Sequence, residues 1–321
     1  MAAPSGTFQT YQAVGNAESV ADIIYDMSPT KHPFMSNVSR GSASATFEQW
    51  QTDALDAATA NNITIEGDDA TNNTANPTVI YGNYTQLSDR VAQVSTTQDR
   101  VKKYGRKSEM QRELAKQMRI LKNDVEKRLC STQAASAGTA ATGRECAGIG
   151  AWLWGNQVKK GAAATTVAVT SGAPTTDPTA GTAGTYTEAN LKTALQYCWE
   201  DGGEPNMVLV GAHNKQLNSA FTGIATQYRD NPQVGSATII GSADVYVGEF
   251  DTVNIVASHF TPANNVYVLD TSTWEVLFLQ PFSIDPLAKT GHSVRKMVSA
   301  EYTLKANYPN ANSKIYSTTV S

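Results

Sequence analysis

The chain has 321 residues, of which 40% are hydrophobic and 17% are charged, and its formal net charge is −4. That length and apolar content allow a substantial core in one large domain or in two or three ordinary ones. The mildly acidic balance argues against a dedicated nucleic-acid binder, and without a long apolar run or an N-terminal signal pattern, no membrane span and no export signal are expected.

The N-terminal part of the sequence predicts an arm without a core of its own. Residues 17–27 carry apolar side chains at helical spacing and predict a short amphipathic helix. Pro29 and Pro33 then favour an extended path, because a residue that precedes a proline is biased away from the helical region.

Two strands that run out and back are predicted at residues 44–50 and 78–87. The stretch between them, residues 56–77, consists mainly of turn-forming Asn, Thr, Ala and Asp. Phe47 and Trp50 are the large apolar side chains of the outgoing strand. The pattern therefore predicts a long protruding hairpin with a polar tip.

Residues 105–130 predict a long helix of about 39 Å, at roughly 1.5 Å per residue. Ser108 and Gln111 are a candidate capping box at its start. The other faces of the helix are rich in Arg and Lys. Steps of three and four residues place one apolar stripe along it, made of Met110, Leu114, Met118, Leu121, Val125 and Leu129.

A connection rich in small residues follows this helix. Residues 134–150 are Gly-rich and precede Trp152 and Trp154, and residues 161–185 predict one strand followed by a loop of Gly, Pro and Thr. We interpret the stretch as a connection between domains.

The C-terminal half predicts an α/β or α+β module of about a hundred residues. Its first helix has Thr187 as N-cap and Gly202 as C-terminal stop, and a buried strand at 207–210 and a second helix at 212–224 follow. Short strands then alternate with turns. The tail predicts a long strand, a Pro-Asn turn and a final strand.

No pattern of catalytic or metal-binding residues stands out. The four histidines do not form a metal-ligand pair, and the three cysteines have no metal spacing and are expected to be free thiols of a reducing cytosol. Cys146 follows Arg144 and Glu145, which could lower the pKa of a thiol, but no histidine lies near it in sequence. Residues 67–73 lack the spacing of a calcium loop. No cofactor, metal or enzymatic activity is expected.

Five segments, taken in their order along the chain, resemble the major capsid proteins of tailed bacteriophages. They are residues 33–55, 82–129, 148–156, 187–211 and 285–311. The resemblance covers about four-fifths of the chain, and residues 161–185 match least. It implies an α+β fold of the Hong Kong 97 type, which has an N-terminal arm, an extended loop, a peripheral domain with a long spine helix, and an axial domain.

The resemblance also implies a division of the chain. Residues 1–40 would be the arm, and residues 41–86 the extended loop, a β-hairpin that lies across an adjacent subunit. Residues 87–185, with the spine helix at 105–130, and the return strands at 285–321 would form the peripheral domain. Residues 186–284 would form the axial domain.

Contacts between subunits are expected along the hairpin and the spine helix. Apolar anchors would find their core partly on another chain, and the acidic hairpin would pair with a basic face of a neighbour. The candidate contact residues are Phe34, Phe47, Trp50, Glu48, Asp53, Asp56, Glu66, Asp68, Asp69, Arg112, Lys116 and Arg119.

The resemblance implies a structural subunit that self-assembles into hexamers and pentamers of an icosahedral or prolate head around double-stranded DNA, without sequence-specific DNA binding. Scaffolding and portal proteins would be partners, and decoration proteins are left open. The subunit would belong to the virion and assemble in the host bacterial cytoplasm. Two alternatives remain, namely the shell of an encapsulin-type nanocompartment and a cytosolic hydrolase with its site in residues 187–284.

Some capsids of this fold join a lysine of the extended loop to an asparagine of a neighbour by an isopeptide bond. This chain has no lysine between Lys31 and Lys102. We therefore expect no cross-link through the loop.

Overall fold

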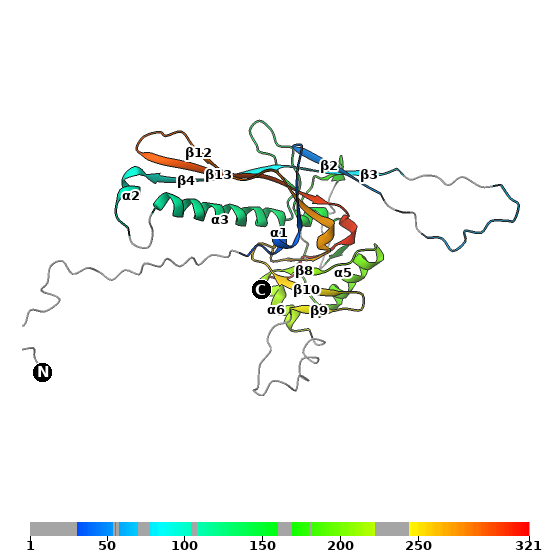
Figure 1. Ribbon diagram of the computed structural model, residues 1–321. Helices are drawn as coiled ribbons and strands as arrows, with labels where there is room; N and C mark the ends of the chain where they lie inside the picture. The colour runs from blue at the N-terminus through cyan, green and yellow to red at the C-terminus, as the bar shows by residue number, and fades with distance from the viewer. Residues whose placement is uncertain are drawn as a thin grey trace, which may run out of the picture.

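The computed structural model describes residues 31–53, 55, 58–69, 77–103, 108–159, 169–179, 181–221 and 244–320. Their helices and strands form a mixed α+β architecture (Figure 1). A long helix and a sheet of long strands make up one part, a second sheet with its own helices makes up another, and a hairpin projects away from both. The helix predicted at 17–27 lies outside the described residues, and so do residues 236–241, which form one of the short strands predicted in the C-terminal half.

The sheet of long strands has the order β1-β12-β13-β4. β13 pairs antiparallel with both β12 and β4, and β1 joins the other side of β12 in parallel. The short helix α2, Thr96–Arg100, follows β4. The strands are β1 Ser39–Ser42, β4 Gln86–Ser95, β12 Trp274–Pro286 and β13 Ser293–Ala306.

Helix α3, Glu109–Leu129, packs along this sheet (Figure 1). The predicted apolar stripe is confirmed as its packed side, since Met110, Leu121, Val125 and Leu129 are buried, and Leu114 and Met118 are partly buried against the same clusters. Ser108 is the N-cap, because its Oγ accepts a hydrogen bond from the Gln111 backbone N–H at 3.4 Å. The predicted start, residues 105–107, lies outside the described residues.

The second sheet has the order β5-β14-β11-β8-β10-β9. Its inner strands β8 and β11 are buried along their whole length, as predicted for residues 207–210. Two helices accompany this sheet, α5, Glu188–Glu200, and α6, Ala212–Ser219. Thr187 caps α5 and Gly202, at a φ of +76°, follows its end, which confirms both predicted boundaries. The strands are β5 Gln157–Lys159, β8 Met207–Val210, β9 Val245–Val247, β10 Thr252–Ala257, β11 Asn265–Leu269 and β14 Ser313–Tyr316.

Membership of the two sheets does not change at residue 284, where the axial domain was predicted to end. β12 begins at Trp274 and pairs with β13, so the strand predicted at its start belongs to the sheet of long strands. β14 pairs with β11 and β5, so the last strand of the tail belongs to the second sheet. Backbone pairing decides both memberships, and local sequence does not encode which distant strand a segment will pair with. The 3-10 turns η3, Thr271–Thr273, and η4, Pro309–Ala311, mark the two crossings.

The expected extended path after Pro33 is wrong. Pro33 opens the short helix α1, Pro33–Asn37. Proline suits this first helical position because its fixed φ is already helical and its missing N–H would have no partner there.

The remaining elements are the projecting hairpin, one short helix and a second, smaller hairpin. The hairpin itself is β2, Phe47–Thr52, and β3, Val79–Tyr84, paired antiparallel as predicted. Helix α4, Ile149–Trp152, begins at the end of the Gly-rich stretch 134–150. In the Gly/Thr-rich connection, β6, Val169–Thr170, and β7, Ala173–Pro174, form a small second hairpin.

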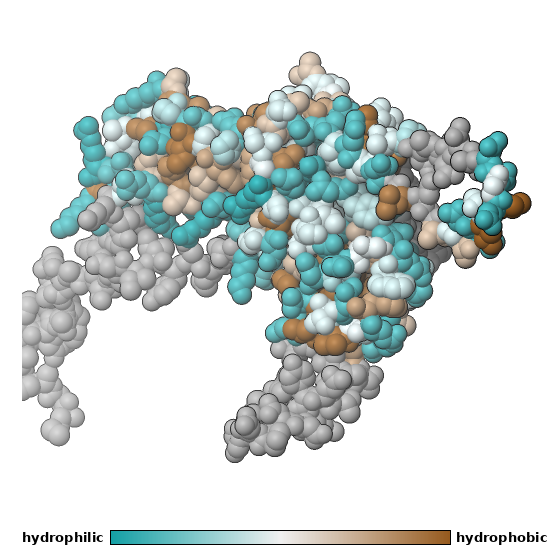
Figure 2. All heavy atoms as spheres, turned by 45° about the vertical axis from the view of Figure 1, so that its right-hand side comes forward, coloured by the Kyte–Doolittle hydropathy of each residue, from teal (hydrophilic) through white to brown (hydrophobic). Residues whose placement is uncertain are grey.

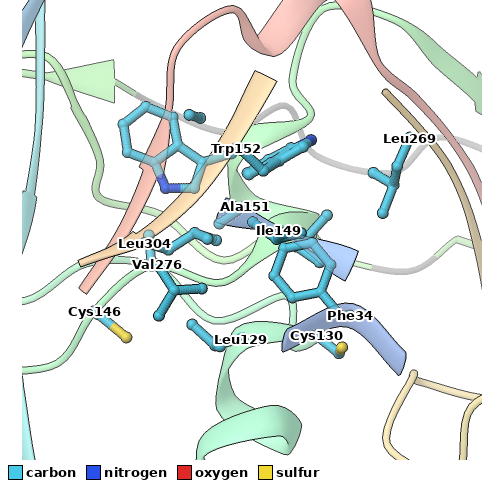
Figure 3. Close-up of a cluster of buried hydrophobic side chains, with 14 of the residues drawn as sticks. Phe34, Leu129, Cys130, Cys146, Ile149, Ala151, Trp152, Leu269, Val276 and Leu304 are labelled. Atoms are coloured by element: carbon cyan, nitrogen blue, oxygen red, sulfur yellow. The ribbon is translucent and has the colours of Figure 1, made fainter. Parts of the chain in front are cut away.

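One apolar cluster joins both sheets, α1, α3 and α4 (Figure 3). Phe34 of α1 points into it beside Ile149 and Leu129, and Trp152 lies across from Leu269 of the second sheet. Phe34 and Trp152 are completely buried. The two parts of the molecule therefore share a core, which holds the root of the hairpin between them.

Candidate assembly site: the projecting hairpin and its root

The inner end of the hairpin is anchored in the subunit's own core. Trp50 is 8% exposed, its indole Nε1 donates a hydrogen bond to the Ala306 carbonyl at 2.9 Å, and its ring lies 5.4 Å from that of Trp152. Phe47 is partly buried, 4.5 Å from the ring of Tyr84. Phe34 and Trp50 thus need no neighbour for their burial, contrary to the expectation from sequence.

Asn83 fastens the returning strand and was missed by sequence reasoning. The side chain is completely buried, its Nδ2 donates to the Leu304 carbonyl at 2.8 Å, and its Oδ1 accepts from the Ala147 N–H at 2.9 Å. Two good hydrogen bonds satisfy an amide that would otherwise be costly to bury. A polar residue between Gly82 and Tyr84, in a strand of large apolar residues, was the available signal.

The outer part of the hairpin is exposed and carries apolar side chains. Ile63 is 82% exposed and Ile65 is 77% exposed, and Leu55, Val79 and Ile80 are exposed as well. Figure 2 shows hydrophobic groups among hydrophilic ones at the far end of the projection. Exposed apolar groups of this kind are typical of surfaces that associate with a partner.

Acidic side chains accompany the apolar ones. Asp53, Glu66, Asp68 and Asp69 are exposed, whereas Asp56 lies outside the described residues. Glu48 differs from the expectation, because its Oε2 accepts hydrogen bonds from the Ser44 and Ala45 N–H groups at 3.0 and 3.2 Å. It caps its own turn at the base of the hairpin and is less available for a neighbour.

The basic side chains of α3 lie far from the hairpin of the same subunit. Figure 1 shows α3 and the hairpin projecting in opposite directions. Lys116 and Arg119 are exposed, and Arg112 lies 3.7 Å from Glu109 of the preceding turn. The described parts of the hairpin and of α3 thus point apart within one chain, and a charge pairing between subunits stays a prediction.

Two charged residues of α3 belong to the interior, although neither is part of its apolar stripe. Arg128 donates to the Cys146 carbonyl at 2.8 Å and pairs with Glu145 at 3.3 Å. Glu126 is completely buried, and its two carboxylate oxygens accept hydrogen bonds from the Phe34 and Met35 N–H groups at 2.8 and 2.9 Å. The N-terminal end of α1 is thereby fixed to α3.

None of the three cysteines has the surroundings that a nucleophilic thiol needs. Burial raises the pKa of the Cys146 thiol to about 11 and that of Cys198 to about 12, and it also raises the pKa of Cys130. A nucleophilic cysteine needs the opposite shift. Among the described residues, no cluster of metal-ligating side chains is found and no helix could cross a membrane.

Two sequence comparisons match the chain to capsid proteins. A family model, the SU10 major capsid protein, matches residues 3–319. The major capsid protein of Escherichia phage Phieco32 is 26% identical, over 96% of each chain.

Solved structures show the fold. The capsid of cyanophage P-SCSP1u is 12% identical with a TM-score of 0.62, over 94% of this chain and 92% of that one. The SrpI encapsulin of Synechococcus elongatus PCC 7942 is 14% identical with a TM-score of 0.58, over 95% and 94%. At such low identities the similarity to an encapsulin indicates only that the two proteins share the Hong Kong 97-type fold. The match to the capsid family model favours a phage capsid protein over an encapsulin. The chain belongs to the SU10 major capsid protein family and is a major capsid protein of a bacteriophage, a structural component of the virion shell.

Proposed function

We propose that copies of this chain form the hexamers and pentamers of a closed phage head, with the hairpin of each subunit lying across a neighbour. The observation that carries the proposal is the contrast along the hairpin. Its root is buried and hydrogen-bonded in its own subunit, while its outer part exposes Ile63 and Ile65.

Covering this outer part with a neighbouring subunit would lower the free energy of the hairpin. An isolated two-stranded hairpin is marginal in water. Docking would bury apolar side chains that contribute about 1.5–3 kcal/mol each when fully covered. Repetition of such contacts around a closed symmetric shell holds each subunit in place several times over.

The other functional assignments follow from the capsid role. The head would enclose double-stranded DNA without sequence-specific contacts, in line with the net charge of −4. Portal and scaffolding proteins would be partners during assembly in the host cytoplasm. The arm, expected at residues 1–40, would reach along a neighbouring subunit with the part that precedes α1, because α1 and β1 pack on their own subunit.

The proposal is tested with a double variant, Ile63→Ser and Ile65→Ser. Purified protein is examined by negative-stain microscopy and sedimentation. The natural chain should form shells, tubes or sheets, and the variant should remain as folded small species with an unchanged circular dichroism spectrum.

The matched control is Ile63→Val with Ile65→Val, which keeps branched apolar side chains at both positions and should assemble. Normal shells from the serine variant would contradict a role of these side chains in assembly. A natural chain that stays monomeric under all assembly conditions would contradict the proposed function itself.

A further inference from the structure

The small hairpin β6–β7 makes an unusually close backbone contact with the projecting hairpin. Its turn residues Ser171 and Gly172 have φ values of +52° and +81°, in the left-handed region that glycine tolerates best. A Cβ added at Gly172 would lie 2.2 Å from the Ile80 carbonyl oxygen and 3.0 Å from the Tyr81 Cα. The turn therefore lies directly against the backbone of β3.

A hydrogen bond fixes this contact. The Gly82 N–H donates to the Gly172 carbonyl oxygen at 3.2 Å. Gly82 is also closely packed against a side chain, because a Cβ there would lie 2.6 Å from the Phe47 ring. At Gly82 the strand thus contacts both the turn at Gly172 and an aromatic side chain of its own hairpin.

The segment behind the turn is tied to the body of the subunit. Ala173 is 2% exposed in the main core, and the Pro174 carbonyl accepts from the Ala135 N–H at 2.8 Å. The Asp177 carboxylate accepts a hydrogen bond from the Ala134 N–H, just beyond α3. Further along, the Gly184 N–H donates to the Ser317 carbonyl at 2.9 Å. A turn anchored in this way can resist movement of β3.

The contact lies where the hairpin leaves the core. Along β3, Val79 and Ile80 are exposed, Tyr81 is partly buried, and Gly82 and Asn83 are buried. Beyond this point the described residues 58–69 are exposed throughout. A small rotation of β3 at Ile80 would move the whole outer part of the hairpin.

We propose that the Ser171–Gly172 turn is a positioning element, which sets the direction in which the projecting hairpin leaves the subunit. This inference rests on the proposed function, because the direction matters only if the hairpin must reach a defined place on a neighbour. The proposal gives a role to the Gly/Thr-rich connection, which its amino-acid composition indicated only as a connection between domains.

The test substitutes Gly172→Ala, which places a methyl group against the Ile80 carbonyl and strains the backbone. The matched control is Gly138→Ala. Gly138 also has a positive φ, +70°, and a Cβ there would lie 2.6 Å from the Thr142 carbonyl oxygen, within its own loop. Both variants place a methyl group at a residue of positive φ and close to a carbonyl oxygen, but only the first does so against the hairpin.

Hairpin direction is measured by spin-label distances in unassembled subunits that carry Ile63→Cys on the hairpin and Lys192→Cys on α5. The three natural cysteines are buried and should not take the label. Gly172→Ala should shift or broaden the distance distribution, and Gly138→Ala should leave it as in the natural chain. Hydrogen exchange should show roughly tenfold faster exchange of the Gly82 amide in Gly172→Ala.

If Gly172→Ala does not fold, Asp177→Ala is used, because it removes one tie of the segment without adding any atom near β3. It should broaden the same distribution. An unchanged distribution in the variant that folds would overturn the positioning role and leave the proposed function intact. Failure of the natural chain to assemble would instead contradict the proposed function, whatever the spin-label distances show.

Discussion

At the scale of single residues, the interior of this subunit depends on polar groups placed with their partners. Glu126 and Asn83 are both completely buried, and each bonds to the backbone of a segment far away in sequence. Trp50 does the same through its indole N–H. Each of these contacts fixes one end of a segment, α1 or the hairpin, on the common core.

Trp50→Phe should lower the free energy of unfolding by about 1–3 kcal/mol, because it leaves the buried Ala306 carbonyl without this donor and creates a small void. Denaturant unfolding of the subunit measures the change. Trp199→Phe is the control, since Trp199 is 57% exposed and its substitution should change stability by less than about 0.5 kcal/mol. Equal losses in both variants would contradict the anchoring role of Trp50.

Glu126 should give the subunit a distinct pH dependence. Burial raises the pKa of its carboxyl group above 4.5, and the Met35 and Phe34 N–H groups oppose this shift without cancelling it. The folded chain then holds the proton more tightly than the unfolded chain. Its contribution to stability is fully present below pH 4.5 and is lost as the pH rises through the folded-state pKa.

The measurement compares the free energy of unfolding of the natural chain and of Glu126→Gln across this pH range. Relative to the variant, the natural chain should lose stability as the pH rises, by about 1.4 kcal/mol for each unit of pKa elevation. Glu66→Gln, on the exposed hairpin, removes the same charge and serves as control. Parallel curves for the natural chain and Glu126→Gln would refute the assignment.

At the scale of elements, the hairpin exposes acidic side chains and α3 exposes basic ones. The two elements project in opposite directions. Such a distribution favours contacts between subunits over contacts within one. Exposed pairs of this kind contribute about 0–1 kcal/mol each, so they set register and encounter rate more than affinity.

Assembly should therefore be slower in concentrated sodium chloride, because the Debye length falls from about 10 Å at 0.1 M to about 3 Å at 1 M. Light scattering at fixed protein concentration follows the rate. Asp68→Asn with Asp69→Asn should assemble more slowly at low salt and respond less to added salt. A rate that is insensitive to salt would argue against pairing of the hairpin with α3.

At the scale of the whole molecule, the shell should be held together without covalent bonds through the hairpin. An isopeptide bond needs a lysine amine beside an asparagine amide, with a carboxylate to take up the proton. No lysine lies between Lys31 and Lys102, so the hairpin offers no nucleophile.

Boiled particles should thus run on a reducing, denaturing gel as one band near 34.3 kDa. A ladder of oligomers that survives boiling would show that another lysine, such as Lys31, forms the bond. Mass spectrometry of the ladder would identify it.

The sequence by itself determined the elements whose patterns are local. The stripe of α3, the caps at Ser108 and Thr187, the stop at Gly202 and the two strands of the hairpin all follow from periodicity and from backbone preferences, which act over a few residues. The order of these segments also carried the resemblance to the capsid family.

Tertiary structure alone decided which distant segments meet. Residues far apart in the chain meet where β14 pairs with β11, where Trp50 is buried on Ala306, where Glu126 binds the start of α1 and where Gly172 contacts Ile80. The sheet to which β12 belongs was decided in the same way. A charged residue on a helix has the same local pattern whether water or a backbone amide satisfies it. Only the packed fold supplies the partner that makes its burial favourable, and for that reason these contacts could not be predicted from local sequence.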